Sequence, residues 1–260
     1  MGRCAGDDPV PSRLAMRAPR RYPPGLVPVP FPPIEPPKTA IAFPDPRRLG
    51  RREVVAIGED FRPYTVLEAY RRGVFPWPHT SPTGDPMVLW FSPNPRAIFP
   101  IEAEPHWSRS LRRTLRHHPY TVTVDEDFEG TIRACGETRA ETGTWITPAL
   151  LAGYLELHAL GWAHSVEVWD TSTTPRRQVG GIYGIAIGGA FAGESMFHKE
   201  TDCSKIAFAS LVERLRAGGF VLFDVQVQNR HLASLGCIEV PRPTYLDRLD
   251  AALRVEARLP

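Results

Sequence analysis

Two stretches in the C-terminal half of the chain combine the alternation of a β-strand with polar side chains. Residues 221–228 place four apolar side chains on one face of the predicted strand and Asp224, Gln226 and Gln228 on the other. In residues 193–197, Glu194 and Met196 are two apart, which predicts that they share one face. Polar groups on an apolar sheet cost free energy unless they are hydrogen-bonded or used. These polar residues are therefore the first candidates for a chemical role.

The same patterning predicts the remaining elements. Strands are expected at 53–57, 88–92, 120–124, 165–169, 179–187, 190–197 and near 238. Helices are expected at 64–72, 106–118, 127–135, 147–161, 205–217, 230–235 and 245–254, and residues 75–78 are expected to form a loop. The glycines at 188 and 189 predict a hairpin turn.

The order of these elements predicts the fold class. The second half runs strand, hairpin, helix, strand, helix, strand, which indicates an α/β or α+β fold with a mixed sheet. An all-parallel nucleotide-binding sheet is not favoured. Residues 9–46 are rich in proline, which excludes helix and central strand and predicts a disordered or polyproline-II lead-in.

Composition narrows the class of protein. The 260 residues are 42% hydrophobic and 23% charged with a net charge of +2, as in ordinary globular proteins. No apolar run has the length of a membrane span, and four isolated cysteines lack the spacing of a zinc site. We expect a cytoplasmic protein without a bound metal.

Positive charge gathers on one predicted helix. Four arginines follow the helical spacing i, i+3, i+4, i+7: Arg109, Arg112, Arg113 and Arg116. Such a stripe is either a solvated helix face or a phosphate-binding surface.

Several common chemistries are not favoured. There is no Walker loop, and the glycines at 180–184 lie inside a predicted strand. Ser195 is flanked by Glu and Met within a predicted strand and does not stand at the strand–helix turn of a nucleophile elbow. No HExxH-like histidine pair occurs. The remaining possibility is catalysis by positioning and proton transfer on an activated substrate, with no cofactor.

Seven ordered motifs carry a family resemblance: GVFPW (73–77), LWFSPNPR (89–96), SRS (108–110), GTWIT (143–147), HSVEVW (164–169), GESMF (193–197) and HLASLG (231–236). Together they resemble the bacterial leucyl/phenylalanyl-tRNA–protein transferases over residues 41–249. The resemblance implies an N-acyltransferase-like mixed sheet with helices on both faces over 96–256. It also implies a smaller N-terminal α/β domain over 41–95, and residues 1–40 are then the proline-rich lead-in.

The implied activity moves Leu or Phe, and possibly Met, from aminoacyl-tRNA to the α-amine of proteins that begin with Arg or Lys, which marks them for degradation. By resemblance, Asp224 and Gln226 handle the proton, Glu194 orients the amine, and Asn229 lies near the acceptor. The ester donor is already activated, so no metal or nucleophile is needed. Without the resemblance, Asp224 and Gln226 can equally be a buried polar pair that pins two strands.

The resemblance also implies binding residues. The amino-acid pocket is expected from Ile182, Met196, Phe208, Leu211, Leu215 and Phe223, which otherwise are core residues. The 3′-terminal adenosine of the tRNA is expected on Trp77 and Trp145, with Tyr70 nearby, and Phe91 stands where the family usually has tryptophan. The arginine stripe is expected to hold acceptor-stem phosphates.

Two alternatives remain open. One is an acyltransferase with another donor or acceptor, such as an acyl-CoA, although the connection 198–204 has no glycine to hold a pyrophosphate. The other is a tRNA-binding module without activity. We expect a monomer.

Overall fold

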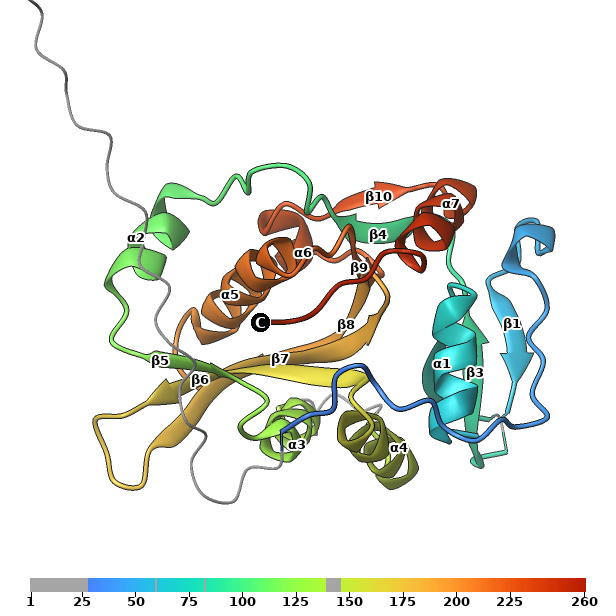
Figure 1. The fold of residues 1–260 in the computed structure, drawn as a ribbon, viewed down its shortest axis with the longest axis horizontal. Helices are drawn as coiled ribbons and strands as arrows, with labels where there is room; N and C mark the ends of the chain where they lie inside the picture. Colours follow the sequence, from blue (N-terminus) through green and yellow to red (C-terminus); the bar gives the residue numbers. More distant parts are fainter. Residues whose placement is uncertain (1–27, 59, 82, 139–145) are drawn as a thin grey trace, which may run out of the picture.

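The computed structural model describes residues 28–58, 60–81, 83–138 and 146–260. Figure 1 shows two sheets with helices packed around them. The strands are β1 (Val54–Ile57), β2 (Phe75–Thr80), β3 (Pro86–Phe91), β4 (Arg96–Phe99), β5 (Thr121–Val124), β6 (Ala163–Asp170), β7 (Arg177–Ile187), β8 (Ala190–His198), β9 (Leu222–Gln226) and β10 (Ile238–Val240). The helices are η1 (Pro46–Arg48), α1 (Pro63–Arg71), α2 (Arg109–His117), α3 (Phe128–Glu137), α4 (Pro148–Ala159), α5 (Cys203–Ala217), α6 (Arg230–Ser234) and α7 (Arg242–Ala252).

The larger sheet has the strand order β10-β4-β9-β8-β7-β6-β5. Its neighbours are antiparallel except for β8 and β9, which run parallel because α5 connects them. Helix α5 packs on one face of this sheet, and α3 and α4 pack on the other (Figure 1). The prediction of a mixed α/β sheet with helices on both faces is confirmed.

The smaller sheet has the order β1-β3-β2 and packs with α1 against the main body. One apolar cluster is continuous across both parts, since Leu67 and Trp90 belong to it together with Leu150 and Tyr183. The predicted division at residue 95 stays a prediction, but the two parts share this core.

Three local differences from the sequence predictions matter for the site. The predicted loop at 75–78 is the start of β2, because an edge strand tolerates Pro76 and Pro78. Strand β4 was not predicted. Strand β9 ends at Gln226 rather than at 228, because Gln226 takes a left-handed backbone conformation with φ 66°.

The proline-rich lead-in is partly inside the described residues. The backbone of Ile34 donates to the carbonyl of Leu160 at 2.8 Å and accepts from Trp162 Nε1 at 2.8 Å. Glu35 forms an ion pair with Arg71. Residues 28–40 therefore contact the main body. The prediction of a disordered or polyproline-II lead-in stays a prediction for residues 1–27, which lie outside the described part.

Candidate active site

A pocket opens where the two parallel strands separate. Strands β8 and β9 pair only at Ala190–Leu222, Phe191–Phe223 and Ala192–Asp224. The residues that follow on each strand line a pocket of about 300 Å³, which is within the size of small-molecule sites. Its lining is Phe75, Pro76, Trp77, Ile182, Gly193, Glu194, Ser195, Met196, Phe208, Phe223, Val225, Gln226, Val227, Gln228, Asn229 and Leu232.

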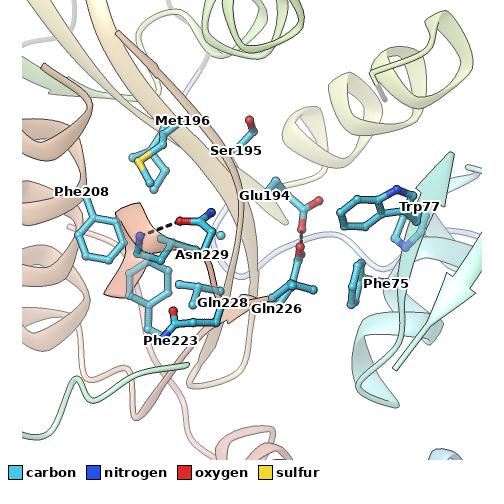
Figure 2. A pocket seen from close by; sticks show the side chains of 16 residues that line it. Phe75, Trp77, Glu194, Ser195, Met196, Phe208, Phe223, Gln226, Gln228 and Asn229 are labelled. Carbon is cyan, nitrogen blue, oxygen red and sulfur yellow. Dashed lines mark hydrogen bonds between the residues drawn. The ribbon is translucent and has the colours of Figure 1, made fainter. Parts of the chain in front are cut away.

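One side of the pocket is apolar. Figure 2 shows Met196, Phe208 and Phe223 grouped together, and Ile182 also lines the pocket. Phe208 and Phe223 pack with ring centroids 5.3 Å apart. Leu211 and Leu215, which the resemblance implied here, lie in the core on the same helix and do not line the pocket. Both leucines lie further along α5 than Phe208, which is the residue of this helix that lines the pocket.

The other side is aromatic and belongs to the smaller sheet. Trp77 on β2 is 42% exposed, and its ring meets those of Phe75 and Phe91 at centroid distances of 6.1 and 6.3 Å. Phe91, at the family's usual tryptophan position, therefore supports Trp77. An exposed indole edge-packed in this way can stack on a base. Trp145 lies outside the described residues.

A hydrogen-bonded carboxylate lies between these two sides. Glu194 Oε1 accepts from Gln226 Nε2 at 2.8 Å and from the Tyr70 hydroxyl at 2.5 Å, and Oε2 accepts from the Tyr154 hydroxyl at 3.0 Å. Figure 2 shows the Glu194–Gln226 pair between Trp77 and the apolar residues. Burial raises the pKa of the Glu194 carboxyl to about 7, and the two tyrosine hydrogen bonds oppose that rise.

Two sequence expectations differ here. Glu194 and Met196 do not share a face, because the β7–β8 register shifts between Tyr183 and Gly184 and leaves Glu194 as an extra residue. Glu194 reaches the tyrosines of one core cluster, and Met196 packs against the other. Tyr70 is only 4% exposed and donates to Glu194, so its ring is not open to a base.

Asp224 is bound to an arginine rather than free. Its two oxygens accept from Arg96 Nε at 2.8 Å and Nη2 at 2.6 Å, and both side chains are almost fully buried. Asp224 also accepts from the Tyr245 hydroxyl at 2.9 Å and from the backbone N–H of Gln226 at 2.9 Å. Burial lowers the pKa of Arg96, but the charge of Asp224 outweighs this and raises it. The carboxylate is thus paired and holds the backbone of Gln226.

Two amides complete the lining. Asn229 caps α6, its Oδ1 accepting from the backbone N–H of Leu232 at 2.8 Å, and its NH₂ group is left for other partners. Gln228 Nε2 donates to the carbonyl of Cys237 at 2.7 Å. Gln228 Oε1 is buried and has no hydrogen-bond partner among the residues that the structure describes, although it belongs to a pocket-lining side chain.

The arginine stripe lies on α2, beside α5 and apart from β3, the strand with which β2 pairs (Figure 1). All four side chains, Arg109, Arg112, Arg113 and Arg116, are exposed. None forms an ion pair within the described ranges 28–58, 60–81, 83–138 and 146–260. Arg116 Nε donates to the backbone carbonyl of Arg112 at 3.2 Å, so the four guanidinium groups lie on the surface of α2 without a carboxylate partner among the described residues.

No helix in the described part of the chain is long and apolar enough to cross a membrane. Among the same residues, no group of three or more His, Cys, Asp or Glu side chains is arranged to hold a metal ion.

A mixed sheet whose parallel pair opens at a pocket defines an acyltransferase-like α+β protein. Family models described as leucyl/phenylalanyl-tRNA protein transferase and its N-terminal domain match residues 98–250 and 59–94. Proteins named leucyl/phenylalanyl-tRNA–protein transferase are similar in Cereibacter sphaeroides (49% identity over 75% of this chain and 86% of the relative) and Shewanella denitrificans (47%, over 75% and 80%). One from Pseudoalteromonas atlantica is 45% identical over 84% and 88%. The chain belongs to the leucyl/phenylalanyl-tRNA–protein transferase family and is an aminoacyltransferase.

The sequence missed two of the site's partners. Arg96 was part of a motif but had no role, because nothing in the sequence pairs it with Asp224, 128 positions away. Tyr154 was recognised only as a helix residue. The signal for Arg96 is its place directly before the apolar run 97–99, where a buried arginine needs a partner.

Proposed function

We propose that this protein transfers Leu or Phe from aminoacyl-tRNA to the α-amine of proteins that begin with Arg or Lys. One observation carries the proposal: the Glu194–Gln226 pair lies between an aromatic surface and an apolar pocket (Figure 2). An aminoacyl ester has the same three parts, an adenosine, a carbonyl carbon and an apolar side chain. The order of groups in the substrate matches the order in the site.

Each part of the donor then has a partner. The adenine stacks on Trp77, and the Leu or Phe side chain enters between Met196, Phe208 and Phe223. The free Oε1 of Gln228 accepts from the ammonium group of the donor amino acid. A wall of Met and Phe discriminates weakly among Leu, Phe and Met, since one methylene changes binding by about 1–3 kcal/mol.

The tRNA body binds outside the pocket. The arginine stripe on α2 contacts acceptor-stem phosphates, which adds affinity that depends on salt and not on base sequence. A cytoplasmic location, a monomeric state and the marking of acceptors for degradation remain predictions from the sequence.

The direct test supplies charged leucyl-tRNA and four peptides that differ only in their first residue, Arg, Lys, Asp or Ala. We expect new N-terminal leucine on the Arg and Lys peptides, detected by mass spectrometry, and a background rate on the Ala peptide. Transfer to the Asp peptide instead redirects the acceptor specificity. Binding of the tRNA without transfer to any peptide contradicts the proposal.

A further inference from the structure

Glu194 has room for one more hydrogen bond. An ionised carboxylate offers about four lone-pair positions. Three are filled, by Tyr70 and Gln226 on Oε1 and by Tyr154 on Oε2. The remaining position is on Oε2, and Glu194 is partly accessible from the pocket. A donor that enters the pocket can therefore reach an oxygen of this carboxylate.

Asp224, the other carboxylate of the site, is much less accessible to a hydrogen-bond donor in the pocket. It is 2% exposed, it is not among the residues that line the pocket, and its oxygens accept from Arg96, Tyr245 and the Gln226 backbone. Its carboxylate compensates the buried charge of Arg96, and a buried charge without a partner is unfavourable. Its structural effect is to hold Gln226, whose left-handed backbone conformation directs the amide toward Glu194.

We propose that Glu194 is the proton acceptor and donor of the transfer reaction, with Asp224 and Arg96 acting only as positioning residues. The inference rests on the proposed function. It assigns the proton to the one carboxylate in the pocket lining that keeps an open lone pair, in place of the Asp224–Gln226 route that the sequence suggested.

The step balances in atoms and charge. The neutral α-amine attacks the ester carbonyl carbon, and a C–N bond forms while one N–H proton passes to Glu194. The C–O bond to the ribose then breaks, and Glu194 returns the same proton to the departing ribose oxygen. The products are the amide and the free hydroxyl of the tRNA, and Glu194 is again a carboxylate.

The surroundings suit this role. The groups that face Glu194 are Tyr70 from α1, Tyr154 from α4 and Gln226 from β9, while Asp224 acts from a greater distance with its charge balanced by Arg96. Burial raises the pKa of both tyrosines well above its usual range, so they stay hydrogen-bond donors at working pH. A carboxyl with a pKa of about 7 can both take and return a proton near neutrality.

The test measures the single-turnover transfer rate against pH for wild type, Tyr154→Phe and Tyr245→Phe. Removing the Tyr154 hydroxyl deletes a hydrogen bond that lowers the pKa of Glu194. The acid limb of the pH–rate profile should therefore move up by about one pH unit. Tyr245→Phe instead removes a hydroxyl that donates to Asp224, so the acid limb of the profile should stay where it is. A limb that moves with Tyr245→Phe and not with Tyr154→Phe overturns the proposal.

Glu194→Gln provides the second measurement. It keeps the size of the side chain but cannot take the proton, so the rate at saturating substrates should fall about 10²–10⁴-fold with little change in KM. Circular dichroism checks that the variant is folded. Full activity of Glu194→Gln, with wild-type transfer intact, contradicts this inference alone, whereas absence of transfer by the wild type contradicts the proposed function.

Discussion

At the scale of single residues, the buried ion pair between Arg96 and Asp224 is where we expect a single substitution to change the free energy of unfolding most. Removing one partner leaves an uncompensated buried charge, so Arg96→Met should lower the free energy of unfolding by about 3–5 kcal/mol. The double variant with Asp224→Leu should recover much of this loss. The exposed pair of Arg47 and Asp247 is the control, and Arg47→Met should cost less than about 1 kcal/mol. Urea unfolding followed by circular dichroism measures all three, and equal effects of the two single variants contradict the prediction.

Glu194 should also affect stability with pH. Its folded pKa, about 7, exceeds the ordinary 4.5, so between these values the folded state binds more protons than the unfolded state. Stability from this group therefore falls as pH rises from about 4.5 to 7, by at most about 3 kcal/mol. The difference in unfolding free energy between Glu194→Gln and wild type should grow over that window. It should be flat above pH 8, and a constant difference from pH 4 to 8 argues against the raised pKa.

Trp77 should act through its aromatic face. Trp77→Ala should weaken binding of a minimal aminoacyl-adenosine by about 1–3 kcal/mol, roughly 5- to 150-fold, because one stacked base is lost. Trp77→Phe should keep much of the affinity. Isothermal titration with a non-hydrolysable amide analogue measures it, and an equal loss in both variants would show that the contact is not stacking.

The sequence could predict the type of the site residues but not their partners. Glu194, Asp224 and Gln226 were found because polar side chains interrupt apolar strands. Which of them is free to react depends on Arg96 and Tyr154, which reach the site only through the tertiary fold. The face of Glu194 was mispredicted because a one-residue bulge has no signature in the alternation.

At the scale of elements, periodicity worked where strands and helices are long. Helix α5 and the hairpin of β7 and β8 were predicted to within two residues of the observed bounds. Strand β4 was missed because its four residues are all buried and show no alternation. Strand β2 was missed because proline suggests a loop, although the open edge of the smaller sheet accommodates it.

At the scale of elements, we expect α2 to contribute to the binding of tRNA. Arg112→Glu with Arg113→Glu should weaken binding of whole aminoacyl-tRNA at least tenfold at low salt and reduce the dependence of affinity on salt. Binding of aminoacyl-adenosine should be unchanged, because α2 lies apart from β2. Arg48→Glu with Arg51→Glu makes the same charge change in the exposed segment before β1 and is the control. Figure 1 shows β1 on the opposite side of the molecule from α2. An equal loss on the tRNA and on the small substrate would show that α2 acts on the pocket.

At the scale of the whole molecule, residues 28–40 are part of the folded body. Ile34 accepts a hydrogen bond from the Trp162 indole, and Glu35 forms an ion pair with Arg71. Compared with a chain that starts at Pro28, one that starts at Lys38 should lose about 2–4 kcal/mol of unfolding free energy, from two backbone-linked hydrogen bonds and the exposed indole. Thermal unfolding followed by tryptophan fluorescence measures the loss. Identical melting temperatures would show that this segment contributes nothing.

Arg96 donates hydrogen bonds to the carbonyl of Gly73 as well as to Asp224. This arginine therefore links a residue shortly before β2, which carries Trp77, to β9, which carries Gln226. Because β2, which carries Trp77, begins two residues after Gly73, loss of this hydrogen bond is expected to change how Trp77 lies relative to the Glu194–Gln226 pair. Under the proposed function, binding of charged tRNA and transfer of its amino acid would then both depend on Arg96.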